Sequence, residues 1–119
     1  MKVFLVEDSP LLGPRLEAML ASIAGARLVG QATGAQKAIQ AILAEKPDAV
    51  VLDIHLDEGS GFDVLKALQK SAPQVAVFVL TNFPGEPYRR KAASLGARGF
   101  FDKSGEFDAL REALAAHAA

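Results

Sequence analysis

Residues 48–61 read DAVVLDIHLDEGSG. Its centre, from Ala49 to Leu52, is an unbroken apolar run, which is typical of a strand buried on both faces of a sheet. The run ends in Asp53, and Asp57 and Glu58 follow closely. A carboxylate at the end of a buried strand costs free energy unless another group compensates its charge. The stretch therefore predicts a central strand and a partner for Asp53.

Apolar runs of the same kind recur along the chain, and segments with helical spacing separate them. The runs are Val3–Val6, Arg27–Ala32, Ala49–Asp53, Val75–Thr81 and Gly99–Phe101. This alternation of strand and helix predicts an α/β fold, with a parallel sheet covered by helices on both faces. Right-handed crossovers leave few topologies, and we expect a single doubly wound five-stranded sheet in the order 2-1-3-4-5. No linker or repeat divides the sequence, so residues 1–119 are expected to form one domain.

The segments between the runs carry apolar stripes at intervals of three and four residues. Two prolines bear on where the first helix begins. If the helix began at Pro10, Pro14 would fall in its second turn and remove a backbone hydrogen bond. We expect this helix to start late rather than to be kinked. The stripes are Leu12, Leu16, Met19, Leu20 and Ile23; Ala35, Ala38, Ile39, Ile42 and Leu43; Phe62, Leu65 and Leu68; Tyr88, Ala92 and Leu95; and Phe107, Leu110, Leu114 and His117.

Composition narrows the class of protein. Of the 119 residues, 50% are hydrophobic and the net charge is −1, which argues against disorder and against a nucleic-acid-binding domain. The absence of cysteine excludes a disulfide framework, a thiolate metal site and a cysteine nucleophile. The first apolar stretch, Val3–Val6, is too short for a signal sequence or a membrane span. We therefore expect a soluble cytoplasmic domain that binds neither membranes nor nucleic acid.

Polar side chains mark the ends of four of the five predicted strands, at the sheet edge where open α/β folds bind ligands. They are Glu7 and Asp8 after the first run, Asp53 at the end of the third, Thr81 at the end of the fourth and Lys103 after the fifth. Three nearby carboxylates raise one another's pKa unless a cation intervenes, and such oxygen ligands suit Mg²⁺. A hydroxyl and an ammonium group suit phosphate oxygens. Asp53 is thereby predicted to accept a phosphoryl group.

Taken in order, these motifs resemble the receiver domains of bacterial two-component response regulators. The stretch FLVEDS, residues 4–9, resembles the segment with the acidic pair, and DAVVLDIHLDEGSG resembles the acceptor strand and its loop. The stretch VFVLTN, residues 77–82, resembles the segment with the switch hydroxyl, and GFFDKS, residues 99–104, the segment with the lysine. The likeness covers essentially the whole chain. It implies a flavodoxin-like (βα)5 fold and a signalling switch controlled by phosphorylation.

The resemblance implies an acceptor and a metal site. Asp53 is then the phosphorylation site, and Mg²⁺ is the expected cofactor. The implied ligands are Asp8, Asp53 and the main-chain carbonyl of His55, with Glu7 holding the ion through water. The imidazole of His55 is expected at the surface, because one nearby histidine does not make a histidine metal site.

The resemblance also implies a switch. Thr81 and Lys103 would contact the bound phosphoryl group, with Thr81 moving toward it while the ring of Phe100 turns inward. The surface of the fourth helix, fifth strand and fifth helix would then change, altering partner contacts or producing a self-dimer. A sensor histidine kinase or a phosphotransfer protein is the implied donor. Plain core packing is the alternative role for Phe100. Phe100 and Phe101 are adjacent on one strand, so their side chains are expected to point to opposite faces.

The sequence departs from the family pattern near the site. Glu7 stands where aspartate is common, Asp57 where proline is common and Asn82 where a small residue is common. Asp57 adds negative charge that bears on metal affinity. Ser104 replaces a residue that is often a cis-proline. Because a cis bond before a non-proline residue costs about 3 kcal/mol, we expect the Lys103–Ser104 bond to be trans.

Other functions compete with the switch. A receiver-like interaction module without phosphorylation would lack an essential group, and none is missing. A hydrolase with an aspartyl-phosphate intermediate would need an aspartate where His55 stands, and a flavin carrier would need a phosphate loop where residues 7–13 read EDSPLLG. We expect a phosphoacceptor with slow autodephosphorylation rather than a turnover enzyme. The sequence leaves open whether this receiver stands alone or belongs to a longer regulator.

Overall fold

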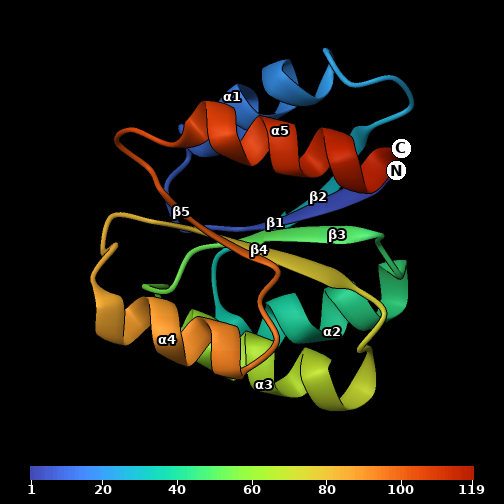
Figure 1. The fold of residues 1–119 in the computed structure, drawn as a ribbon. Helices are drawn as coiled ribbons and strands as arrows, with labels where there is room; N and C mark the ends of the chain where they lie inside the picture. The colour runs from blue at the N-terminus through green and yellow to red at the C-terminus, as the bar shows by residue number, and fades with distance from the viewer.

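The computed structural model describes residues 1–119 and contains one five-stranded sheet (Figure 1). All neighbouring strands are parallel, and their order across the sheet is β2-β1-β3-β4-β5. The predicted α/β class and strand order are confirmed. The strands are β1 (Lys2–Val6), β2 (Arg27–Ala32), β3 (Ala49–Leu52), β4 (Ala76–Thr81) and β5 (Gly99–Asp102).

Five helices cover the two faces of this sheet. The helices α1 and α5 lie on one face, and α2, α3 and α4 lie on the other (Figure 1). This is the doubly wound, flavodoxin-like arrangement, in which the carboxyl ends of all strands reach the same edge. The helices are α1 (Leu12–Leu20), α2 (Ala35–Glu45), α3 (Gly61–Ser71), α4 (Glu86–Ser94) and α5 (Phe107–Ala118).

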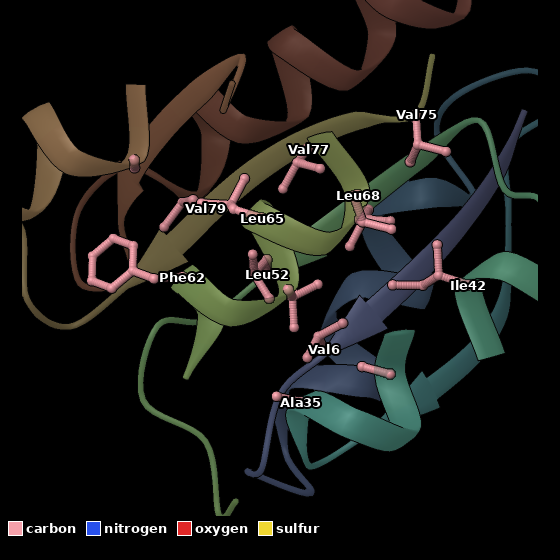
Figure 2. Packing of buried hydrophobic residues seen from close by; sticks show 14 of the residues in the cluster. Val6, Ala35, Ile42, Leu52, Phe62, Leu65, Leu68, Val75, Val77 and Val79 are labelled. Carbon is pink, nitrogen blue, oxygen red and sulfur yellow. The ribbon is translucent and has the colours of Figure 1, made fainter. Parts of the chain in front are cut away.

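Strand β3 is buried on both faces because its side chains alternate between two hydrophobic clusters. Val50 and Leu52 join the cluster that packs against α2, α3 and α4, part of which Figure 2 shows from close by. Ala49 and Val51 join the cluster that packs against α1 and α5. None of the four side chains is exposed to solvent. The strand therefore carries Asp53 to the edge of the sheet as a rigid support.

Helix α1 begins at Leu12, so the predicted late start is confirmed. Pro14 is the third residue of the helix, in the first turn, where a backbone N–H has no intrahelical acceptor. The predicted stripe of α2 is wrong at Leu43, which is 40% exposed. Leu43 lies about 100° around the helix from the buried Ile42, at the side of the face that packs on the sheet.

The loop after β3 has a fixed local geometry. A Cβ on Gly61 would collide with the main-chain carbonyl of Asp53, so glycine lets α3 begin against that carbonyl. Ser60 caps the helix, with its backbone N–H donating to the Asp63 carboxylate at 3.0 Å. Regular β3 ends at Leu52, one residue before the predicted end, although the N–H of Asp53 still donates to the β1 carbonyl of residue 6.

The remaining boundaries differ little from the predicted ones. Strand β1 starts one residue earlier, β4 starts one residue later and β5 ends one residue later than predicted. No peptide bond is cis, so the expected trans bond between Lys103 and Ser104 is confirmed. None of the helices has the length and apolar character that crossing a membrane requires.

Candidate functional site

Three carboxylates meet at the carboxyl edge of the sheet. Glu7 and Asp8 follow β1, and Asp53 follows the neighbouring strand β3. One oxygen from each residue lies within 4.8 Å of the others. Glu7 is fully buried and Asp53 is 6% exposed, while Asp8 is open to solvent. Oxygen ligands gathered in this way suit a divalent cation such as Mg²⁺.

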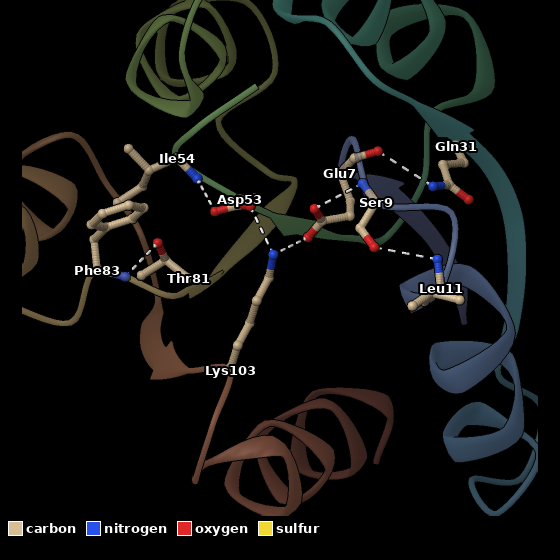
Figure 3. Close-up of polar contacts among 9 residues, drawn as sticks. All are labelled: Glu7, Ser9, Leu11, Gln31, Asp53, Ile54, Thr81, Phe83 and Lys103. Carbon is tan, nitrogen blue, oxygen red and sulfur yellow. Dashed lines mark hydrogen bonds and ion pairs between the residues drawn. The ribbon is translucent and has the colours of Figure 1, made fainter. Parts of the chain in front are cut away.

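Lys103, which follows β5, places its ammonium group between two of these carboxylates (Figure 3). Its Nζ donates to Asp53 Oδ2 at 2.8 Å and forms an ion pair with Glu7 Oε2 at 2.5 Å. Burial by itself lowers the pKa of Lys103, but the hydrogen bonds to Asp53 and Glu7 outweigh burial and raise that pKa. The ammonium group therefore stays charged and compensates the buried end of β3.

Glu7 is the most heavily desolvated acid of the site. Burial raises its pKa, the contact with Lys103 opposes the rise, and the charge of Asp53 adds to it. Its Oε1 accepts a hydrogen bond from the Ser9 N–H at 3.1 Å. Its Oε2 lies 2.5 Å from Lys103 Nζ, so both oxygens of this buried carboxylate have a partner. One ammonium group for three carboxylates leaves negative charge uncompensated at this edge, which fits a divalent cation beside them.

Thr81 ends β4 and is fully buried. Figure 3 shows it at the same edge of the sheet as Asp53. Its Oγ1 accepts a hydrogen bond from the Phe83 N–H at 3.1 Å, which leaves the hydroxyl proton free to be donated. The ring of Phe83 stacks on the imidazole of His55 with centroids 4.0 Å apart. His55 lies at the surface as expected, and it links the loop after β3 to the loop after β4.

Phe100 lies on β5 and is buried in the cluster that packs against α2, α3 and α4. Its neighbour Phe101 packs on the opposite cluster, so the predicted opposite orientation is confirmed. The guanidinium of Arg89 on α4 lies 4.8 Å from the centre of the Phe100 ring. Arg89 Nη1 also donates to the main-chain carbonyl of Phe100 at 3.3 Å. Helix α4 therefore holds Phe100 by both its ring and its backbone.

Two of these contacts were not predicted from the sequence. Phe83 supports Thr81 and stacks on His55, but the sequence marks it only as an apolar residue in a polar loop. Arg89 is one of three consecutive basic residues in α4, and nothing in the pattern distinguishes it from its neighbours.

Comparison with known proteins identifies the family. The chain matches the response regulator receiver domain family across residues 3–115. The chain belongs to this family. Receiver domains of two-component regulators are phosphoacceptors and not turnover enzymes. The predicted family is therefore confirmed, and so is the prediction of a phosphoacceptor rather than a turnover enzyme. They bind Mg²⁺ at an acidic cluster, and in this receiver domain the acidic cluster is Glu7, Asp8 and Asp53.

Individual relatives agree with this assignment. This receiver domain is 33% identical over 113 residues to YvfU, an uncharacterized transcriptional regulatory protein of Bacillus subtilis, covering 95% of this chain and 56% of that one. It is 27% identical to the chemotaxis protein CheY of Thermotoga maritima, covering 95% of this chain and 93% of that one. The BeF3-activated receiver domain of RstA from Klebsiella pneumoniae is 26% identical, with a TM-score of 0.86 over 98% of this chain and 97% of that one. The chain spans about half the length of several curated relatives that it matches, YvfU among them.

Proposed function

We propose that residues 1–119 form a receiver domain that accepts a phosphoryl group on Asp53. The contact between Lys103 Nζ and Asp53 Oδ2, at 2.8 Å and across 50 positions of sequence, carries this proposal. The contact joins the ammonium group that follows β5 to the carboxylate that follows β3. Glu7 and Asp8 lie at the same edge of the sheet. A charged ammonium group beside a carboxylate nucleophile suits phosphoryl transfer, where positioning and charge neutralisation provide most of the catalysis.

The proposed donor is a sensor histidine kinase or a phosphotransfer protein, which would place the domain in the cytoplasm. An oxygen of Asp53 forms the new O–P bond, the N–P bond of the phosphohistidine breaks, and its electron pair stays on the imidazole nitrogen. Lys103 neutralises charge on the transferred group. Thr81 donates its free hydroxyl proton to a phosphoryl oxygen, while the Phe83 N–H holds the hydroxyl oxygen. Slow hydrolysis returns the free carboxylate.

The proposed metal ligands are Asp8, Asp53 and the main-chain carbonyl of His55, with Glu7 acting through water. A bound Mg²⁺ supplies neutralisation of phosphoryl charge. The three carboxylates with a single ammonium among them, and the oxygen-only donor set, support this assignment. Asp57, where the family often has proline, is exposed and adds charge outside this ligand set.

The proposed switch couples Asp53 to the surface of α4, β5 and α5. A phosphoryl group that binds one arrangement of Thr81 and Lys103 better than another shifts the population toward it. Phe100 is the proposed aromatic partner in this shift, and its contact with Arg89 ties it to α4. The output is a changed surface for a protein partner or a second copy of the domain. This domain itself does not bind nucleic acid.

The test is phosphorylation with Mg²⁺ and a small phosphodonor, read by intact mass. Wild-type protein should gain one phosphoryl group, Asp53→Ala should gain none, and Asp8→Ala should react more slowly because a metal ligand is lost. Asp57→Ala is the matched control, since it removes a nearby exposed carboxylate and should still react. A wild-type protein that takes up no phosphoryl group would favour a non-phosphorylated interaction module instead.

A further inference from the structure

Two adjoining cavities open beside Lys103, on the side of the molecule where α1 and α5 lie. The first, of about 290 Å³, is lined in part by Ser9, Arg15, Asn82 and Lys103. The second, of about 220 Å³, shares Arg15 and Lys103 and reaches Phe107. Lys103 lines both cavities, and its Nζ contacts Asp53, so this side chain connects the cavities to the proposed acceptor. Their combined size suits a small ligand rather than a large one.

Arg15 differs from Lys103 in having no anionic partner. Lys103 is shared between Asp53 and Glu7, whereas Arg15 forms no ion pair and donates no hydrogen bond to another residue. Its guanidinium instead lies 4.2 Å from the centre of the Phe107 ring. Stacking on an aromatic face restrains the guanidinium while its N–H donors stay free. A free guanidinium held in a cavity wall is a binding group for carboxylate or phosphate oxygens.

A phosphodonor brings further negative charge to an edge that already holds Glu7, Asp8 and Asp53. The ammonium of Lys103 is already engaged by two of those carboxylates. The remaining cation in the wall of the larger cavity is Arg15. Charge that develops on a leaving group in this cavity is therefore matched by Arg15.

We propose that Arg15 binds the leaving carboxylate of a small acyl phosphate while the phosphoryl group passes to Asp53. This inference rests on the proposed acceptor role of Asp53. An oxygen of Asp53 forms the O–P bond, the P–O bond to the acyl oxygen breaks, and its electron pair leaves on the carboxylate. No proton or electron is gained or lost in this step. Arg15 thus favours acyl phosphates over donors that release a neutral group, because it binds an anionic leaving group and has no equivalent role for a neutral one.

The experiment compares two donors that differ in leaving group. Acetyl phosphate releases a carboxylate, whereas phosphoramidate breaks an N–P bond and releases neutral ammonia once the nitrogen is protonated. Arg15→Gln should slow phosphorylation by acetyl phosphate about fivefold, the upper range for one exposed ionic contact. Its rate with phosphoramidate should change less than about twofold. Arg15→Lys should lie between, since it keeps the charge and loses the planar fork.

The matched control is Arg27→Gln. It removes the same charge at the amino end of β2, opposite the site, and should leave both rates unchanged. Equal losses with both donors in Arg15→Gln, or no loss with acetyl phosphate, would overturn the leaving-group assignment.

A binding measurement separates this inference from the acceptor role. The Arg15 Nε–Hε resonance of unphosphorylated protein should shift on titration with sodium acetate and stay fixed with sodium chloride at the same ionic strength. Absence of an acetate-specific shift contradicts the carboxylate site. Failure of both donors to phosphorylate wild-type protein would instead contradict the role of Asp53.

Discussion

Asp53 sits almost buried at the end of an apolar strand because Lys103 lies against it. The ammonium group contacts Asp53 and Glu7 together, while the exposed Asp8 completes the acidic cluster. Three carboxylates and one ammonium leave an excess of negative charge at the edge. That excess is a source of instability in the absence of metal and a source of affinity for a divalent cation.

Glu7→Gln should therefore stabilise the metal-free protein at neutral pH, because burial costs the charged form of Glu7 more than the contact with Lys103 returns. The pKa of Glu7 is raised above its ordinary value of 4.5, so the folded state binds more protons than the unfolded state just above that pH. Stability then falls as the pH rises through this interval. Urea unfolding in a chelator should show wild type and variant equally stable below about pH 4, where both side chains are neutral, and diverging above it.

Glu17→Gln provides the control for this pH dependence. Glu17 lies exposed on α1, so its substitution should leave the unfolding curve unchanged at every pH. A Glu7→Gln variant less stable than wild type at neutral pH would mean that the ion pair with Lys103 outweighs the cost of burying Glu7.

At the scale of elements, the start of α3 fixes the loop that follows the acceptor. A Cβ at position 61 would lie 2.9 Å from Ile54 Cα and still closer to the Asp53 carbonyl, and both are backbone atoms that cannot turn aside. Gly61→Ala should therefore destabilise the fold by about 2 kcal/mol, as overpacking does. Thermal unfolding measures this loss. Gly105→Ala is the control, because its Cβ would meet no atom within 4 Å and should leave the midpoint unchanged.

The side chain of Arg89 on α4 joins this helix to β5 by packing on the ring of Phe100. Arg89→Ala should lower the free energy of unfolding by about 1 kcal/mol, since it removes a cation–π contact and a hydrogen bond to Phe100. Arg90→Ala is a close match, because Arg90 also pairs with Glu86 but is 82% exposed and has no ring contact. Chemical denaturation should show a loss for the first variant and almost none for the second. Equal effects would show that only the pairing with Glu86 matters.

At the scale of the whole molecule, the parallel sheet makes one site from segments spread over most of the chain. Mg²⁺ that binds this assembled site and not the unfolded chain should stabilise the fold by about 2.7 kcal/mol at 100 times its dissociation constant. Thermal unfolding with and without Mg²⁺ measures the shift. Asp8→Asn should reduce it strongly, because a proposed ligand loses its charge.

Asp57→Asn is the control for the metal effect. It removes one exposed carboxylate near the site without touching the cluster of Glu7, Asp8 and Asp53, so most of the stabilisation should persist. A stabilisation by Mg²⁺ that Asp8→Asn leaves intact would place the ion elsewhere.

The strand order was predictable because apolar runs and helical stripes alternate, and right-handed crossovers restrict their connection. The gathering of Glu7, Asp8, Asp53 and Lys103 followed from that order, since parallel strands end at a common edge. Leu43 was mispredicted because a stripe shows which residues share a side of the helix but not how wide the covered face is. Arg89 was missed because a basic residue on an exposed helix carries no local signal of its partner.

Features that depend on near neighbours could be predicted from the order of residues: where strands and helices form, which strands are buried, and which polar residues stand at strand ends. The contacts of Lys103 with Asp53, of Phe83 with Thr81 and of Arg15 with Phe107 became visible in the three-dimensional fold alone. They depend on side-chain directions across adjacent elements. Local periodicity constrains those directions only to a face of each element.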